Sequence, residues 1–392
     1  MLESGSLPAA GKVHFRGLNS LRFLAALFVV LGHIPMNQSS VGLPMYATGA
    51  FFYKGEPAVA FFFALSGFLI TSLLLEELAR TGDVDVGKFY IRRICRIWPL
   101  YFAVVFFGLF FYNALLPLLG IPYRVGYEPG TALLLYALML PNLMNSLYAV
   151  GGILNPLWSI GVEEQFYLTW APAVRRLRRQ IPWLCAAVFV ASFALFLLNR
   201  WEVFGPHEGK KLVGQLKFHF MAAGGLAAWW LHRRREAFLA LLPFRSRIVQ
   251  SVLFALLVEY YLIGFLRWSW WAVEVLQIFL YTWLIVTVAA NPRNVVPAAN
   301  RVFERLGNVS YGIYMLHMIA VYGTTALFQR MDWWRGNLPL YFASYYTLAI
   351  GGTILLALLS YRFLERPFLR LKDRRFSLVP TAPGGASVGT AP

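Results

Sequence analysis

The sequence predicts an all-α protein: a polytopic transmembrane helical bundle of about ten spans, with one further re-entrant or interfacial segment. Of its 392 residues, 59% are hydrophobic and only 14% are charged, whereas about 25% are charged in an ordinary soluble domain. The mean hydropathy is +0.58, and aromatic residues reach 17%. So few polar side chains cannot cover a soluble globule of this size, and a disordered chain would have the opposite balance. The composition therefore excludes the water-soluble classes.

The spans are predicted from stretches of roughly 20 mainly apolar residues, the length that crosses a bilayer as a helix. Ten stretches qualify: 18–36, 57–79, 97–119, 157–174, 181–199, 216–232, 248–266, 270–290, 309–329 and 340–363. An eleventh apolar stretch, 131–146, is short and is interrupted by Pro141-Asn142.

The positions of Lys and Arg decide whether the eleventh stretch crosses, because cytoplasmic loops carry the excess of positive charge. With the N-terminus inside and 131–146 not crossing, 25 of the 35 Lys and Arg residues lie in inner segments and nine in outer loops or span ends. If 131–146 crossed, the basic cluster at 175–179 would move outside. Ten spans with both termini in the cytoplasm are therefore predicted. The net charge of the chain is +17, but its positive residues are distributed over six inner segments, which argues against a nucleic-acid-binding domain.

The chain is expected to hold one folded domain. Residues 1–17 form a cytoplasmic N-terminal segment, 18–370 the transmembrane domain, and 371–392 a cytoplasmic tail. The tail is poor in bulky apolar residues and is expected to be disordered. No removable signal peptide is expected. The two cysteines, Cys95 and Cys185, are 90 residues apart and predict neither a disulfide framework nor a metal site.

Charged and titratable groups inside a span are costly, so each is a functional candidate. The first span carries Arg22 and His33, which lie roughly 16 Å apart along a helix. Arg22 is thus placed near the cytoplasmic side and His33 in the outer half of the membrane. A lone histidine in a helix is often a satisfied core residue, and that interpretation stays open. Of the six histidines, only His33 and His317 sit well inside long apolar stretches.

A second polar group opens the span at 157–174. Ser159 and Glu163 share a helix face at i and i+4, and Glu164 with Gln165 widens the polar patch. Ser159 could cap the start of the helix, and the glutamates would suit its positive end. That structural interpretation explains one acidic residue better than it explains two.

Two further clusters remain ambiguous from spacing alone. Arg93 and Arg96 share a face at i and i+3 beside Arg92, and guanidinium groups suit phosphate. The same arginines also fit a cytoplasmic anchor for the third span. Tyr314 and His317 likewise share one face, close to Tyr311.

Taken together, these motifs closely resemble the bacterial acyltransferase-3 family. The resemblance runs in order from about residue 16 to 370 and is carried by the following residues: Leu21-Arg22-Phe23 with His33, Phe61 to Phe68 around Ser66-Gly67, Arg92-Arg93 and Arg96-Ile97-Trp98-Pro99, Leu157-Trp158-Ser159 through Glu163-Glu164-Gln165, Ser310-Tyr311-Gly312-Ile313-Tyr314 with His317, and Phe363-Leu364-Glu365-Arg366-Pro367.

The resemblance implies an integral O-acyltransferase of the bacterial inner membrane. Such enzymes move an acyl group, commonly acetyl, from cytoplasmic acyl-CoA to a hydroxyl of a glycan or glycosylated acceptor, and no metal is expected. Family members differ in carrying an extracytoplasmic hydrolase-like domain. This chain is expected to lack it and, where transfer needs such a domain, to act with a separate extracytoplasmic partner protein. The alternative function is a proton-coupled secondary transporter or exporter, which would also use a histidine and glutamates inside the membrane.

The resemblance and the spacing together give each candidate residue an expected role. His33 is expected to be the catalytic base, with Glu163 or Glu164 orienting its imidazole. Four arginines are expected to bind acyl-CoA: Arg22, Arg92, Arg93 and Arg96. Five residues are expected to line the acceptor site: Trp158, Ser159, Tyr311, Tyr314 and His317.

Overall fold

The computed structural model describes residues 15, 17–46, 49–205, 207–264, 269–298, 300–331 and 335–375. Within these ranges the chain forms helices and no strands. Most of the predicted N-terminal segment, and residues 376–392 of the predicted tail, lie outside the described residues. The last helix, α18 (Arg366–Arg375), extends into the stretch expected as a tail.

All ten predicted spans coincide with helices, which confirms the all-α polytopic bundle. They are α1 (Leu18–Ser40), α2 (Gly55–Thr81), α3 (Val86–Phe110), α7 (Leu157–Arg176), α8 (Ile181–Arg200), α10 (Phe218–Arg233), α13 (Arg247–Val258), α14 (Trp270–Ala290), α16 (Ser310–Arg330) and α17 (Leu338–Ser360).

Seven of these, or their continuous extensions, are long and apolar enough to cross a membrane among the described residues. The other three are α7, α10 and α13. Helix α7 carries two glutamates, α10 has 16 residues, and α13 has 12 residues continued by the π-helical turn η3 (Glu259–Ile263). Helix α7 is polar because it supplies part of the interior site described below. Helix α10 is packed against α2 and α8 within the bundle.

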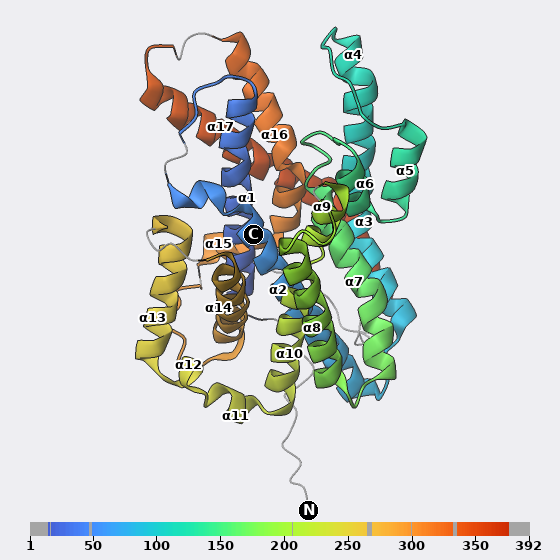
Figure 1. Ribbon diagram of the computed structural model, residues 1–392, viewed down its shortest axis with the longest axis vertical. Helices are drawn as coiled ribbons and strands as arrows, with labels where there is room; N and C mark the ends of the chain where they lie inside the picture. Colours follow the sequence, from blue (N-terminus) through green and yellow to red (C-terminus); the bar gives the residue numbers. More distant parts are fainter. Residues whose placement is uncertain are drawn as a thin grey trace, which may run out of the picture.

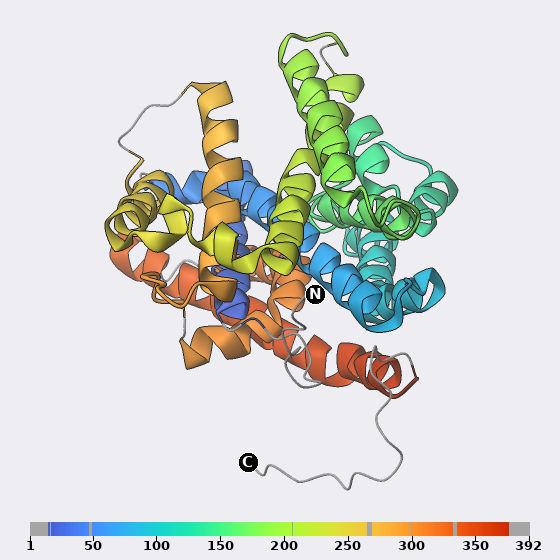
Figure 2. The same ribbon diagram turned by 90° about the horizontal axis from the view of Figure 1, so that it is seen from below.

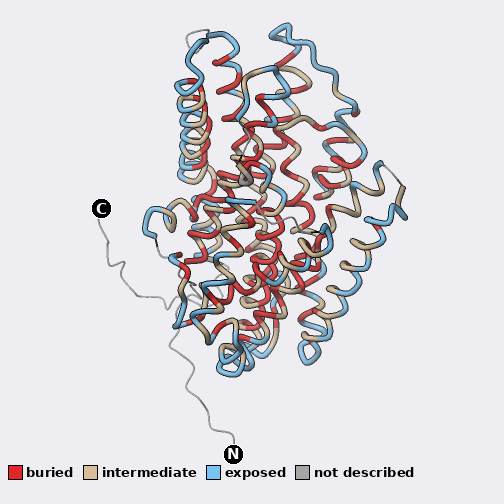
Figure 3. Tube along the Cα trace, turned by 60° about the vertical axis from the view of Figure 1, so that its left-hand side comes forward, coloured by how far each residue is buried: buried red, intermediate tan, exposed pale blue. Residues whose placement is uncertain are grey.

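The outer surface of the bundle is apolar, as a lipid-facing surface must be. Helix α8 has the most hydrophobic window of the seven, yet only 17% of that window is buried. Buried residues run through the interior of the molecule, and exposed residues gather along its ends and outer edge (Figure 3). An exposed helix face of this composition is stable in hydrocarbon and not in water.

The apolar stretch at 131–146 forms two short helices, α5 (Pro129–Ala137) and α6 (Pro141–Leu147). Nine residues of helix span roughly 14 Å, about half of the hydrocarbon thickness of a bilayer. Neither helix can cross, in agreement with the re-entrant or interfacial segment predicted for this stretch.

The remaining elements are short connections. They are η1 (Ala50–Tyr53), η2 (Phe111–Leu115), α4 (Leu116–Leu118), α9 (Glu208–Gln215), α11 (Arg235–Leu239), α12 (Leu242–Arg245), α15 (Arg301–Asn308) and η4 (Tyr361–Glu365). In Figure 1, α4 and α5 lie at one end of the bundle, and α11 and α12 lie at the opposite end.

Helix α2 is central to the bundle and is fixed by very close packing against α10. A β-carbon at Gly67 would collide with the backbone of Met221, and one at Gly224 would collide with the backbone of Ala64. Small residues permit such close approach of membrane helices. Helix α1 packs on the other side between α2 and α16, and seen from below these segments lie near the middle of the molecule (Figure 2). Helices α1, α2, α7 and α16 thereby enclose the site.

Candidate active site

Two cavities lie along the interior of the bundle. The first, the arginine cavity, has a volume of about 240 Å³ and is lined by residues of α1, α2, α3, α7 and α16. Its charged lining residues are Arg22, Arg93, Arg96 and Glu163. The second, the histidine cavity, has a volume of about 510 Å³ and is lined by His33, Trp158, Glu56 and the residues around them. The volume of the histidine cavity lies within the range of about 300–1,000 Å³ that is usual for small-molecule sites, and that of the arginine cavity lies slightly below it.

The arginine cavity collects three cations from two helices. Arg93 and Arg96 lie one turn apart on α3 and reach the same cavity, as their i, i+3 spacing predicts. Arg22 reaches it from α1. The Nε of Arg93 and the Oγ of Ser310, another lining residue, are buried and have no hydrogen-bond partner among the described residues. Buried polar groups are normally bonded, so these two atoms are available to a ligand.

Arg92 lies apart from the other arginines. It is adjacent to Arg93 on α3, so its side chain leaves the helix in a different direction. Its Nη2 donates to Oε2 of Glu77 at 2.8 Å, and both side chains are buried. Glu77 also accepts a bond from the backbone N–H of Asp85 at 2.9 Å. Arg92 therefore fixes α3 to α2 and does not line either cavity.

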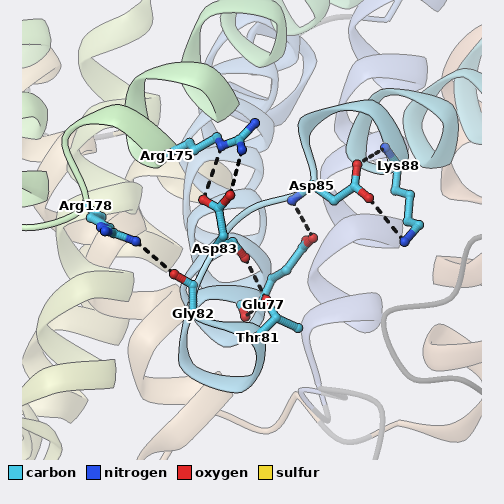
Figure 4. Close-up of polar contacts among 8 residues, drawn as sticks. All are labelled: Glu77, Thr81, Gly82, Asp83, Asp85, Lys88, Arg175 and Arg178. Atoms are coloured by element: carbon cyan, nitrogen blue, oxygen red, sulfur yellow. Dashed lines mark hydrogen bonds and ion pairs between the residues drawn. The ribbon is translucent and has the colours of Figure 1, made fainter.

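The turn between α2 and α3 is also clamped to the end of α7 (Figure 4). Arg175 donates to Asp83 through Nη2 at 2.7 Å and Nε at 3.2 Å. Arg178 donates to the carbonyl of Gly82 at 2.9 Å. Asp85 caps α3 by accepting from the N–H of Lys88. The pKa of Asp83 is lowered by a hydrogen bond from the N–H of Val84 and then by Arg175.

The pKa of the Asp85 carboxyl is lowered as well, because its carboxylate accepts hydrogen bonds from the backbone and the side chain of Lys88. These contacts of Arg175 and Arg178 with Asp83 and Gly82, called the clamp below, hold the turn before the arginine-bearing helix α3 against the end of α7.

In the histidine cavity, His33 is paired with a second histidine. Its Nδ1 lies 2.9 Å from the carbonyl oxygen of Val29 and 3.3 Å from Nε2 of His317. The Nδ1 of His317 lies 2.6 Å from the carbonyl oxygen of Tyr314. Because a carbonyl only accepts, these contacts assign the proton to Nδ1 in both neutral rings. The Nε2 of His33 is then an unprotonated nitrogen with no hydrogen-bond partner among the described residues.

A wall formed by Val59 and Tyr314 separates the two cavities, and both residues line each of them. The hydroxyl of Tyr314 lies 2.7 Å from Oγ of Ser159 and donates to the carbonyl of Pro156 at 3.0 Å. Ser159 faces the arginine cavity, whereas its neighbour Trp158 faces the histidine cavity. Ser159 is thus bonded, from the arginine cavity, to the wall residue Tyr314.

The two glutamates of α7 point in different directions. Glu163 lines the arginine cavity and accepts bonds from the hydroxyls of Ser66 at 2.9 Å and Tyr167 at 3.1 Å. Glu164 accepts a long bond of 3.4 Å from Nε1 of Trp98, and its other oxygen is buried without a partner among the described residues. Neither contacts the imidazole of His33, whose described partners are Val29 and His317.

Tyr311 is placed differently from Tyr314. It lines only the arginine cavity of the two, and its hydroxyl donates to the carbonyl of Ile97 at 2.8 Å. Three residues at these cavities had no expected role: Ser66, which the sequence analysis named only within a motif, Tyr167 and Glu56. Tyr167 lies four residues after Glu163, so helical spacing could have identified it.

Within the described residues, no group of three or more His, Cys, Asp or Glu side chains is placed to bind a metal ion.

Comparison with known proteins identifies the family. The sequence pattern of the acyltransferase domain matches residues 15–359. A putative O-acetyltransferase of Staphylococcus aureus is 25% identical over 93% of this chain and 59% of its own length. Nodulation protein 10 of Rhizobium leguminosarum bv. viciae is 25% identical over 92% of this chain and 94% of its own. Peptidoglycan O-acetyltransferase OatA of Listeria monocytogenes is 22% identical over 94% of this chain and 59% of its own.

The chain thus spans less than two thirds of the length of the first of these relatives. No solved structure gives a significant match. The family match covers nearly the whole chain and favours the enzyme over the transporter, the two functions that the sequence left open. The chain belongs to the acyltransferase-3 family, whose acyltransferase domain matches residues 15–359.

Proposed function

We propose that this enzyme transfers an acyl group, acetyl in the simplest case, from cytoplasmic acyl-CoA to a hydroxyl of a glycan that enters from the opposite side of the membrane. One observation carries the proposal: two cavities of different chemistry share the wall residues Val59 and Tyr314. One cavity offers three guanidinium groups, and the other offers an imidazole with a free Nε2. A phosphate-bearing donor and a hydroxyl acceptor need this combination.

The arginine cavity is the proposed donor site. Arg93 and Arg96 bind the phosphates of CoA, because guanidinium groups form paired, charge-assisted bonds with phosphate oxygens. The narrow pantetheine arm then extends along the cavity past Arg22 toward the wall. Glu163 offsets part of the positive charge when no donor is bound. We leave Arg92 out of the donor site because Glu77 already occupies its guanidinium.

The histidine cavity is the proposed acceptor site. Nε2 of His33 removes the proton from the acceptor hydroxyl as its oxygen attacks the thioester carbonyl. The C–O bond of the new ester forms and the C–S bond breaks. The imidazolium then returns the proton to the departing thiolate, which leaves as CoA-SH. A positioned general base of this kind contributes about 10²–10⁴ in rate.

Four other predicted residues support this step. His317 holds the ring of His33 and keeps its proton on Nδ1. Trp158 lines the acceptor cavity. Ser159 lines the donor cavity and is bonded to Tyr314, the wall residue that the thioester must reach. Tyr311 belongs to the donor side. Glu163 and Glu164 act on the arginine side in this proposal and not on the imidazole.

The membrane orientation follows from charge. The excess of Lys and Arg in alternate loops supports an orientation in which the arginine cavity faces the cytoplasm of a bacterial inner membrane and both termini are inside. A glycan acceptor is supported by one relative, a peptidoglycan O-acetyltransferase. Donors come from the cytoplasm and envelope glycans lie outside, so two cavities that meet inside the membrane suit this transfer.

The proposal is tested with the full-length protein in membranes. Acetyl-CoA labelled in the acetyl group is added together with cell envelopes from a strain of the source organism that lacks the gene. The expected result is release of one CoA-SH for each labelled acetyl that enters the envelope as an alkali-labile ester. Release of CoA-SH without labelled ester, or no release from acetyl-CoA at all, would contradict the proposed transfer.

A further inference from the structure

The histidine cavity contains one carboxylate that no step above uses. Glu56 lies in the first turn of α2 and lines the same cavity as His33. We propose that Glu56 is an acceptor-binding residue, that its carboxylate accepts hydrogen bonds from the hydroxyls of a neutral sugar, and that the buried Lys217 positions it. This inference rests on the proposed function, since it assigns the acceptor class of that same site.

The packing of α1 against the start of α2 brings Glu56 and His33 to one cavity. A β-carbon at Gly32 would lie 3.5 Å from the Cα of Gly55, so the two helices approach closely at this point. The next residue of each helix is His33 and Glu56 respectively, and both line the cavity. A hydroxyl compound held by Glu56 is therefore held beside the proposed base.

Lys217 fixes the position of the carboxylate. Its Nζ lies 3.0 Å from Oε1 of Glu56 and 3.6 Å from Oε1 of Glu274. The side chain of Lys217 is 11% exposed and that of Glu274 is 7% exposed, whereas that of Glu56 is 69% exposed. In this ion-pair network, Lys217 and Glu274 are thus buried, whereas the carboxylate of Glu56 opens into the cavity.

The buried end of this network is anchored on two further helices. Glu274 on α14 contacts Nε2 of His219 at 3.0 Å. Nδ1 of His219 lies 3.0 Å from Oγ of Ser192 on α8. The ammonium group of Lys217 is thus held by Glu56 on α2 and by Glu274 on α14, and His219 and Ser192 fix Glu274 in turn. A side chain anchored in this way loses little freedom when a ligand binds.

A purely structural role explains Glu56 less completely. A carboxylate in the first turn stabilises a helix through its dipole, but an exposed side chain achieves this without a buried lysine. Lys217 already has Glu274 as a counter-ion. Glu56 uses one oxygen on Lys217, while a carboxylate accepts about four hydrogen bonds. The remaining acceptor positions are available to hydroxyl groups in the cavity.

The rest of the lining matches a sugar. Tyr53, Trp158 and Tyr314 contribute aromatic rings, and Ser39 and Asn155 contribute polar groups. Among the described lining residues, Glu56 is the only Asp, Glu, Lys or Arg. Because Lys217 neutralises much of its charge, the site favours neutral hydroxyl groups over a cation and disfavours an acidic sugar.

The experiment measures acceptor and donor saturation separately in the labelled-ester assay, with gene-deleted envelopes as acceptor. Two variants of Glu56 are compared with wild type. Glu56→Gln removes the charge, and Glu56→Asp keeps a charge in the first turn but shortens the side chain by one methylene. Glu202→Gln is the matched control, because Glu202 is exposed, pairs with Lys210 at 2.6 Å and does not line either cavity.

The expected result is a rise of about tenfold or more in the envelope concentration at half-saturation for both Glu56 variants, the size of effect expected for one lost hydrogen bond to a charged group. Half-saturation for acetyl-CoA should stay unchanged, and Glu202→Gln should match wild type. Lys217→Met should act in the same direction as Glu56→Gln, provided that its unfolding temperature matches wild type.

Three outcomes would overturn the inference. Acceptor half-saturation could be unchanged in both Glu56 variants. Donor and acceptor values could move together with a fall in unfolding temperature, as for a structural role. Wild-type acceptor half-saturation could weaken steeply with added salt, which would indicate a cationic acceptor. Loss of labelled ester in wild type itself would instead contradict the proposed function.

Discussion

Nε2 of His317 lies 3.3 Å from Nδ1 of His33, and the two rings are 4.9 Å apart between centroids. The residues are 284 positions apart in the chain and come from α16 and α1. The carbonyls of Val29 and Tyr314 assign the proton of each neutral ring to Nδ1, so Nε2 of His317 accepts from Nδ1 of His33, and Nε2 of His33 carries no proton.

The first prediction concerns His317 as a positioning residue. In His317→Ala, the ring of His33 loses one of its two partners on Nδ1. We expect kcat to fall about tenfold to hundredfold, a fraction of the contribution of a general base, with little change in half-saturation for acetyl-CoA. Steady-state rates of CoA-SH release check this. His317→Gln, whose side chain can still accept a hydrogen bond, should recover part of the rate, and no recovery would argue against the tautomer role.

The second prediction separates neighbouring arginines. Arg93→Ala combined with Arg96→Ala should raise the KM for acetyl-CoA far more than that for the acceptor, because both side chains line the donor cavity. Initial rates at varied donor concentration measure this. An unchanged donor KM would assign these arginines to membrane anchoring alone.

Arg92→Gln should behave differently, since it leaves Glu77 buried without its cation. Breaking a buried pair of this kind costs about 3–5 kcal/mol. We expect a lower unfolding temperature in detergent and a nearly normal donor KM in the folded fraction. A raised donor KM with normal stability would contradict the placement of Arg92 outside the donor site.

The fourth prediction concerns the wall between the cavities. Tyr314→Ala removes a ring that lines both of them and a hydroxyl bonded to Ser159 and Pro156. Water should then reach the thioester more easily. The ratio of acetyl-CoA hydrolysis to acyl transfer should increase in Tyr314→Ala and less in Tyr314→Phe, which keeps the ring. Equal ratios in all three proteins would show that Tyr314 does not separate the cavities.

The fifth prediction concerns the clamp at the turn between α2 and α3. The pKa values of Asp83 and Asp85 are lowered in the folded protein, so their contribution to stability is present above the ordinary carboxyl pKa of about 4 and is lost as the pH falls below it. Unfolding temperatures measured between neutral and acidic pH should decrease accordingly. In Asp83→Asn that decrease should be smaller, because the ion pair with Arg175 is absent at every pH. An identical pH profile would exclude the clamp.

The helices themselves were predictable from the sequence, since long apolar stretches and the Lys and Arg asymmetry are local signals. The shared cavity of Arg93 and Arg96 was predictable for the same reason, because i and i+3 positions on a helix share a face. The stretch 131–146 was predicted as a re-entrant or interfacial segment, and it forms two short helices that cannot cross a bilayer.

The partners of these groups could not be predicted, because they depend on how helices pack. Adjacent residues on a helix point about 100° apart, so Glu163 and Glu164 meet different neighbours, as do Arg92 and Arg93. The pairing of His33 with His317 requires α1 and α16 to pack together. Glu56 gave no signal in the sequence, since Lys217 lies far along the chain and meets it only through the packing of α10 on α2.

The most direct test of the central claim is the rate of CoA-SH release from acetyl-CoA in the presence of envelope acceptor, measured for His33→Ala and for His232→Ala. His232 is an exposed histidine near the end of α10 that lines neither cavity. We predict that His33→Ala is folded and inserted in the membrane but loses acceptor-dependent release, while His232→Ala retains it. Retention of near-wild-type release in His33→Ala would contradict the proposed role of His33 as the base.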